Sequence, residues 1–123
     1  MKRSAMPVIG LVLRSAAYQQ RSARSQLDVA LVAAAVDAPL RLYFMGEAAL
    51  QLAGDRDTRA AGLPVGYRGW ASLTGLTRVS AFIEPAWLER FSELGINPLL
   101  PVKAKSKAQM RADWQKCARL LVL

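Results

Sequence analysis

Short apolar runs separated by polar stretches mark the first part of the chain. Pro7–Leu13 and Leu40–Met45 are nearly unbroken apolar runs, and between them Gln26–Val36 is an alanine-rich stretch with helical spacing. Unbroken hydrophobicity is typical of strands that are covered on both faces, as in parallel sheets wrapped by helices. Residues 7–53 therefore predict a β-α-β unit whose functional groups lie on loops at the strand ends.

The helix predicted in this unit has apolar side chains on more than one face. One stripe with the spacing of a buried helix face contains Leu27, Ala30, Leu31 and Ala34, and the apolar residues outside that stripe are Val29, Val32, Ala33 and Val36. Residues 15–25 are expected to form a polar turn, in which Ser22 and Ser25 are equally good helix caps. Apolar surface of this width indicates either deep burial or contact with another subunit, and we favour the subunit contact.

The second half of the chain continues the alternation of strands and helices. Three further strands are predicted at Arg78–Ile83, Leu99–Val102 and Leu120–Leu123. Short helices are predicted at Glu47–Leu52 and Tyr67–Leu76, on either side of a long irregular segment with several glycines, and two longer ones begin at Pro85 and after Ser106. Five strands that alternate with helices predict a single flavodoxin-like domain over residues 1–123. It would be a three-layer α/β/α domain with a mainly parallel five-stranded sheet.

Composition narrows the class of protein and of chemistry. A chain of 123 residues with 53% hydrophobic content is large enough for one globular core. It contains no histidine and one cysteine, which excludes an internal disulfide, a Ser-His nucleophile and a multi-thiolate metal site. No apolar run approaches the ~20 residues of a membrane-spanning helix, so we expect a cytoplasmic protein without a membrane partner.

The formal net charge of +8 has its densest source near the C-terminus. The candidate basic patch there consists of Lys103, Lys105, Lys107 and Arg111, and Asp113 is the acidic residue nearby. A patch of this kind is consistent with RNA, an acidic protein or another anionic partner. The alternative is a solvated helix face in a basic protein, and the sequence alone leaves both readings open.

A second place for an anion is the loop after the first predicted strand. It has no glycine cradle, which excludes the common nucleotide-binding loops, and no cofactor or metal is expected anywhere in the chain. An anion could still lie at the start of the following helix. The candidate residues for it are Arg14, Ser15, Tyr18, Arg21 and Arg24. A solvated loop is the alternative.

Cys117 is the one side chain that could act as a nucleophile. The spacing of Met110, Trp114 and Cys117 places the thiol on the apolar stripe of the last helix, at the end where the helix dipole opposes a thiolate. We therefore expect a buried core cysteine rather than a reactive one. The three tryptophans occupy packing positions and are likewise expected in the core.

Several segments together resemble the DsrE/DsrF-like family, and most closely its DsrF/TusC branch. The matching segments are VLRSAAYQQ, LDVALVAAAVD, LRLYFMGEAALQL, the helix from Ala86-Trp87-Leu88-Glu89-Arg90 to Leu94-Gly95-Ile96, and CARLLVL. The resemblance covers nearly the whole chain. It implies a small cytoplasmic subunit that assembles with itself or with related sulfur-relay subunits. Relatives transfer sulfur in oxidative sulfur metabolism or in the supply of sulfur for tRNA 2-thiouridine.

The resemblance also shows where this chain departs from its active relatives. In the active branch, a cysteine in the loop after the third strand carries a persulfide. The corresponding segment here is Ala81-Phe82-Ile83-Glu84-Pro85-Ala86, which contains no cysteine. DsrF-type subunits are regarded as structural partners of the active ones. The resemblance therefore implies an accessory subunit, and the missing cysteine argues against catalysis by this chain.

Overall fold

A computed structural model describes residues 7–14, 20–35, 38–53, 68–76 and 78–123. Its strands are β1 (Ile9–Leu13), β2 (Leu40–Phe44), β3 (Val79–Ile83), β4 (Lys103–Ala104) and β5 (Arg119–Val122). They form one five-stranded sheet in the order β4-β3-β2-β1-β5, and every pairing between neighbouring strands is parallel. The α/β fold and parallel sheet predicted from the sequence are confirmed, and β2 lies at the centre.

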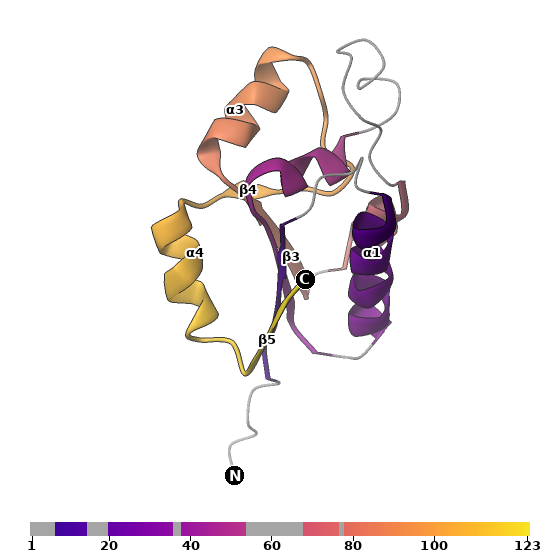
Figure 1. Cartoon of the computed structure of the whole chain (residues 1–123), viewed down its shortest axis with the longest axis vertical. Helices are drawn as coiled ribbons and strands as arrows, with labels where there is room; N and C mark the ends of the chain where they lie inside the picture. Colours follow the sequence, from indigo (N-terminus) through magenta and orange to yellow (C-terminus); the bar gives the residue numbers. More distant parts are fainter. Residues whose placement is uncertain (1–6, 15–19, 36–37, 54–67, 77) are drawn as a thin grey trace.

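Helices cover both faces of this sheet (Figure 1). One face is covered by α1 (Gln20–Ala35), which contacts the 3₁₀ helix η2 (Arg68–Leu73). The other is covered by α4 (Lys107–Trp114), while α3 (Pro85–Glu93) and the 3₁₀ helix η1 (Gly46–Leu52) lie toward the carboxyl ends of the strands. Among the described residues, no helix combines the length and apolar character needed to cross a membrane.

Register assigns each strand residue to one face of the sheet, because side chains alternate along a strand. Val12 pairs with Tyr43, and Tyr43 pairs with Phe82. These three side chains form one apolar cluster with Met110 of α4, which identifies the α4 face. The intervening residues of the central strands, such as Leu11, Leu42, Phe44 and Ile83, belong to the larger core beneath α1.

The structure corrects the predicted start of the first helix. α1 begins at Gln20, so Ser22 and Ser25 lie inside the helix and not at its cap. The segment QRSARS has Ala23 as its one apolar residue and is therefore expected to be a turn, but arginine, glutamine and alanine are good helix formers. The first turns of this helix are mostly polar, so they show no periodic spacing of apolar residues. The helix predicted from apolar spacing therefore begins only at Gln26.

The strand predicted at Leu99–Val102 is wrong. The ladder forms at Lys103–Ala104 instead, where Phe82 pairs with Lys103 and Ile83 with Ala104. The backbone N–H of Leu99 donates to Leu52 O at 2.7 Å, and Pro101 has no backbone N–H that could form a hydrogen bond to a neighbouring strand. This apolar run is therefore a connection that packs against the core, with Leu100 buried.

Candidate functional site

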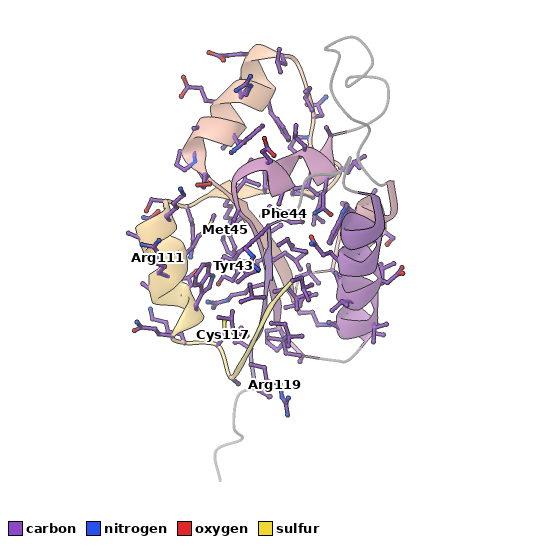
Figure 2. The ribbon with its side chains drawn as sticks, viewed as in Figure 1. Tyr43, Phe44, Met45, Arg111, Cys117 and Arg119 are labelled. Atoms are coloured by element: carbon purple, nitrogen blue, oxygen red, sulfur yellow. The ribbon has the colours of Figure 1, made fainter. Side chains whose placement is uncertain are left out.

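The α4 face of the central strands contains a polar cluster that no single sequence motif predicts. We call it the Asp113 cluster, and it consists of Arg41, Tyr43, Lys105, Asp113 and Cys117. β2 supplies Arg41 and Tyr43, Lys105 follows β4, and Asp113 comes from α4. Figure 2 shows Tyr43 and Cys117 on the side of the sheet that α4 covers. Topology brings these residues together, because β2 is central and α4 crosses over it.

The Asp113 carboxylate is the centre of this cluster. Its Oδ2 accepts a hydrogen bond from the Tyr43 hydroxyl at 3.2 Å and forms an ion pair with Lys105. Arg41 Nη1 lies 4.0 Å from the same oxygen. Asp113 is 9% exposed and Tyr43 is fully buried, so these contacts compensate for the desolvation of both groups.

Aromatic rings surround this carboxylate. Tyr43 stacks on Phe82 with 5.3 Å between ring centroids and meets the edge of Trp114 at 6.0 Å. Lys105 Nζ lies 4.5 Å from the centroid of the Phe82 ring, which gives the ammonium a cation-π contact beside its ion pair. The ring contacts hold Tyr43 and Lys105 in the positions from which they donate to Asp113.

The surroundings shift the pKa values of Asp113 and Tyr43 further from neutral pH, in opposite directions. Burial acts to raise the pKa of Asp113, but the hydrogen bond and charge of Lys105, with help from Tyr43 and Arg41, hold that pKa below its ordinary value. Burial raises the pKa of Tyr43 well above its usual range, and the charge of Asp113 raises it further. An ionised Asp113 and a neutral Tyr43 are stable partners and poor general acids or bases at pH 7.

Cys117 belongs to this cluster but does not lie on the predicted helical stripe. α4 ends at Trp114, and Cys117 lies in the turn after it, half-buried, with Sγ 3.6 Å from Asp113 O. The helix stops here because Lys116 N–H and Cys117 N–H close short turns onto Asp113 and Trp114. Burial raises the pKa of the Cys117 thiol, with Arg41 opposing the shift. The thiol is therefore neutral at pH 7.

Gly10 explains how this turn approaches the sheet so closely. A Cβ at Gly10 would lie 2.8 Å from Cys117 Sγ and 2.8 Å from Leu120 Cδ1. The absence of a side chain on β1 thus makes room for the thiol and for Leu120. The structure assigns Cys117 a packing contact against β1.

Glu84 lies between the carboxyl end of β3 and the start of α3. Its Oε2 accepts a hydrogen bond from Gly46 N–H at 3.0 Å, and its Oε1 lies 3.8 Å from Lys107 Nζ. Gly46 has a φ of +51°, a conformation that glycine adopts without strain. Glu84 therefore connects the end of β2 and the start of α4 at the edge of the sheet.

Two residues of the predicted basic patch lie close to carboxylates of the same chain. Lys105 pairs with Asp113 and Lys107 with Glu84, so two of its positive charges are partly neutralised from beneath. Lys103 on β4 and Arg111 on α4 are exposed. Lys105 is only partly exposed, Lys107 is exposed, and the binding of an anionic partner by these four residues stays a prediction.

The structure describes only some of the candidate anion-binding residues after β1. Arg14 is exposed at the end of the described β1 segment, whereas Ser15 and Tyr18 lie outside the described residues. Arg21 and Arg24 belong to α1, and their side chains also lie outside the description. This anion site remains a prediction. Within the described ranges, no three histidine, cysteine or acidic side chains gather in a way that could hold a metal ion.

The patterns in the sequence missed Asp113, Tyr43 and Arg41 as a group. The signals that could have found them are small: an arginine and a tyrosine two positions apart on a central strand, and one acid in a basic helix. Two charged or polar residues on an otherwise apolar strand require a buried partner, and Asp113 is the acid of the last helix.

Comparison with known proteins gives a likeness of fold. No family model matches the sequence, and no curated protein matches it. Among solved structures, the crystal structure of the YchN protein from E. coli is similar, with a TM-score of 0.72 and 15% sequence identity. The match covers 96% of this chain and 100% of that chain. At this identity the likeness shows a shared α/β fold over the full length of both chains.

Proposed function

We propose that this chain is an accessory, non-catalytic subunit of the DsrE/DsrF-like type, which takes part in sulfur transfer through its assembly with other subunits. The proposal is supported by the resemblance of the sequence segments to that family. It is also consistent with the full-length likeness of fold to YchN. The assembly would be with related sulfur-relay subunits or with further copies of the same chain.

The observation that carries the non-catalytic part is the position of Glu84. In the family's active branch the loop after the third strand carries the persulfide cysteine, and here that loop is Glu84 between β3 and α3. The Glu84 carboxylate is held by Gly46 N–H and lies close to Lys107 Nζ. A carboxylate at this position supplies no thiol on which a persulfide could form.

Cys117 is a poor replacement for that missing cysteine. It lies on the α4 face, in the turn before β5, and packs against Gly10 of β1. Burial raises the pKa of its thiol, which lowers the thiolate fraction that would attack a sulfur donor. A persulfide carrier would need the opposite environment.

The alternative function, a basic module that binds RNA or another anion, rests on fewer residues than the sequence suggests. Lys105 and Lys107 lie close to carboxylates of the same chain, whereas Lys103 and Arg111 form no ion pair with the residues that the structure describes. Each phosphate contact contributes about one unit to the slope of log K against log salt. We expect a slope of about 2 at most from this patch.

Deletion of the gene in its natural host tests the proposal. We expect the deletion to lower either the 2-thiouridine content of tRNA or the rate of sulfur oxidation, and wild-type protein to restore it. Cys117→Ser should restore it to the same extent, because the thiol has no chemical part. A deletion that changes neither the 2-thiouridine content nor the rate of sulfur oxidation would overturn the proposed role in sulfur transfer. Failure of a folded Cys117→Ser protein to restore the phenotype would overturn the non-catalytic role.

A further inference from the structure

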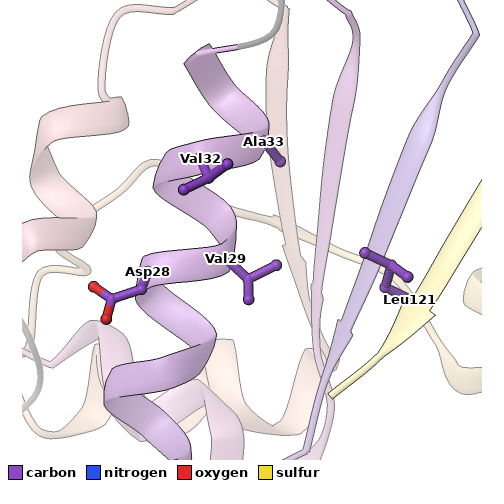
Figure 3. A pocket seen from close by; sticks show the side chains of 5 residues that line it. All are labelled: Asp28, Val29, Val32, Ala33 and Leu121. Carbon is purple, nitrogen blue, oxygen red and sulfur yellow. The ribbon is translucent and has the colours of Figure 1, made fainter.

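The two helical sides of the molecule expose different chemistry. On the α1 side, an apolar hollow of about 350 Å³ lies between α1 and β5 (Figure 3). The residues that line it are Asp28, Val29, Val32, Ala33 and Leu121. On the α4 side the exposed surface is charged. Asp113 is the one acidic residue after Glu93, and it is buried. The segment from Lys103 to the C-terminus therefore exposes basic side chains and no acidic one.

Four exposed cations follow the course of α4. Lys103 precedes the helix, Lys107 is its first residue, Arg111 lies one turn later and Lys116 lies in the turn that follows. The Lys107 side chain is 63% exposed, although its Nζ lies 3.8 Å from a Glu84 carboxylate oxygen. The carboxylates on this side lie beneath the helix, so the outer surface of α4 keeps its positive charge.

The outermost residues of α4 are small. Met110 faces the sheet and is fully buried. Ala108 and Ala112 lie two positions before and after Met110, which is about 200° away around the helix, and both are exposed. Packed helices lie 8–10 Å apart, and small side chains at the contact allow the shorter distances. A second helix on this ridge would therefore come within reach of Lys107 and Arg111 on its flank.

We propose that the outer surface of α4, formed by Lys107, Ala108, Arg111, Ala112 and Lys116, binds an acidic helix of a different protein. Charge complementarity determines the partner, because charges that flank a helix-helix contact select the partner helix. One face of a short helix buries less area than a stable interface needs, so the complex should be transient and sensitive to salt. The inference goes beyond the proposed function and does not depend on sulfur transfer.

The same surface is poorly suited to RNA. Single-stranded RNA is held by aromatic rings on which its bases stack. Here Trp114 packs edge-on against Tyr43 at 6.0 Å, and Phe82 lies beneath Lys105. Double-stranded RNA is recognised over ~16 base pairs, whereas the eight residues of α4 span about 12 Å. The alanine methyl groups at the centre of the surface also offer phosphates no hydrogen-bond donor.

A synthetic peptide tests the charge complementarity. The probe is an alanine-rich helical peptide with glutamate on both flanks, and its control has glutamine in place of every glutamate. Fluorescence anisotropy at low salt should show binding of the glutamate peptide in the micromolar range and binding of the control at least ~10-fold weaker. Arg111→Glu should raise the dissociation constant of the glutamate peptide at least ~10-fold. Arg90→Glu is the matched control, because it makes the same change of charge on α3, and it should raise the constant less than ~2-fold.

A neutral variant separates helix docking from attraction between charges. Ala112→Trp leaves the net charge unchanged and lies at an exposed position, so circular dichroism should show a folded protein. Its indole would hold a second helix away from α4, and peptide binding should weaken at least ~10-fold. A folded Ala112→Trp protein that binds the glutamate peptide as tightly as the wild type would overturn the inference.

Other occupants of this surface would give different results. An RNA hairpin that binds more tightly than the peptide, and that Arg111→Glu weakens but Ala112→Trp does not, would identify RNA as the partner. Self-association of the wild type that Glu89→Lys abolishes would identify α3 of a second copy as the acidic helix. Absence of peptide binding at low salt would show that these cations are only solvated. Each of these results overturns the inference and leaves the proposed role in sulfur transfer standing, because that role is tested by gene deletion.

Discussion

The two faces of the sheet are held by different forces. Beneath α1 the core is almost entirely apolar and includes Leu11, Leu42, Phe44 and Trp70, with one buried amide pair in which Gln51 donates to Gln26 at 2.9 Å. Beneath α4 the described apolar cluster contains Val12, Tyr43, Phe82 and Met110 around the Asp113 carboxylate. Burial of apolar area is non-directional, whereas a buried ion pair requires its partners. The α4 face should therefore respond to charge and pH, and the α1 face to side-chain volume.

The largest effect is expected from the apolar face. Phe44→Ala removes a fully buried ring that packs edge-on against Trp70 with 5.0 Å between centroids. Loss of transfer free energy and the cavity left behind should lower the free energy of unfolding by about 4 kcal/mol. Urea denaturation followed by tryptophan fluorescence measures it. Leu94→Ala, at an exposed position, should change it by less than ~1 kcal/mol, and equal losses would contradict the assignment of the core.

A smaller loss is expected when the carboxylate of the other face is removed. Asp113→Ala leaves the Tyr43 hydroxyl and Lys105 without their acceptor in a mostly buried place. The free energy of unfolding should fall by about 2–3 kcal/mol. Glu89→Ala on the exposed side of α3 is the control and should stay within ~0.5 kcal/mol of the wild type. If Asp113→Ala matched that control, the cluster would contribute nothing to stability.

The stability that the Asp113 carboxylate gives to the α4 face should depend on pH, whereas the apolar α1 face has no such dependence. The pKa of Asp113 is lowered in the folded protein, so its contribution is fully present above the unfolded value, ~3.9, and is lost as pH falls through the folded pKa. The stability gap between the wild type and Asp113→Asn should therefore narrow between about pH 4 and the acid limit of folding. Unfolding midpoints of both proteins measured across acidic pH give this gap. A gap that widens toward low pH would contradict the sign of the shift.

The smallest effect concerns the start of α4. Ser106 accepts a hydrogen bond from Gln109 N–H at 3.1 Å, and Gln109 Oε1 accepts one from Ser106 N–H at 2.8 Å. Ser106→Ala removes one of the two hydrogen bonds of this capping box and should lower the free energy of unfolding by about 1 kcal/mol. Chemical denaturation measures it, with Ser92→Ala in the last turn of α3 as the control. No difference between the two variants would show that packing alone holds α4.

The long elements could be predicted because their own residues repeat a strong pattern. β1 and β2 lie inside the predicted runs, since a strand covered on both faces has apolar residues at nearly every position, with Arg41 as the exception on β2. α3 begins at Pro85 and ends before Gly95, whose φ of +70° suits glycine. β4 could not be placed this way. Its two residues are paired only because Phe82 and Ile83 lie beside them, while the more apolar Leu99–Val102 contains a proline and packs as a connection.

The candidate site was harder to predict than the fold. Lys105 and Lys107 were assigned to a solvent-facing patch, since the sequence shows charge without showing what lies beneath it. Their partners Asp113 and Glu84 come from the last turn of α4 and from the end of β3. Cys117 was expected on the helix, but α4 ends one turn earlier than the apolar period suggests.

The sequence by itself determined that this protein forms a parallel α/β sheet and that the loop after its third strand contains Glu84 and no cysteine. It did so because hydrophobic period and residue identity are local properties. Only the tertiary structure decided that β2 is central, that Asp113 gathers Tyr43, Lys105 and Arg41, and that β5 pairs with β1. Strand order and helix placement depend on which surfaces bury each other, and that free energy belongs to pairs of distant segments rather than to any one of them.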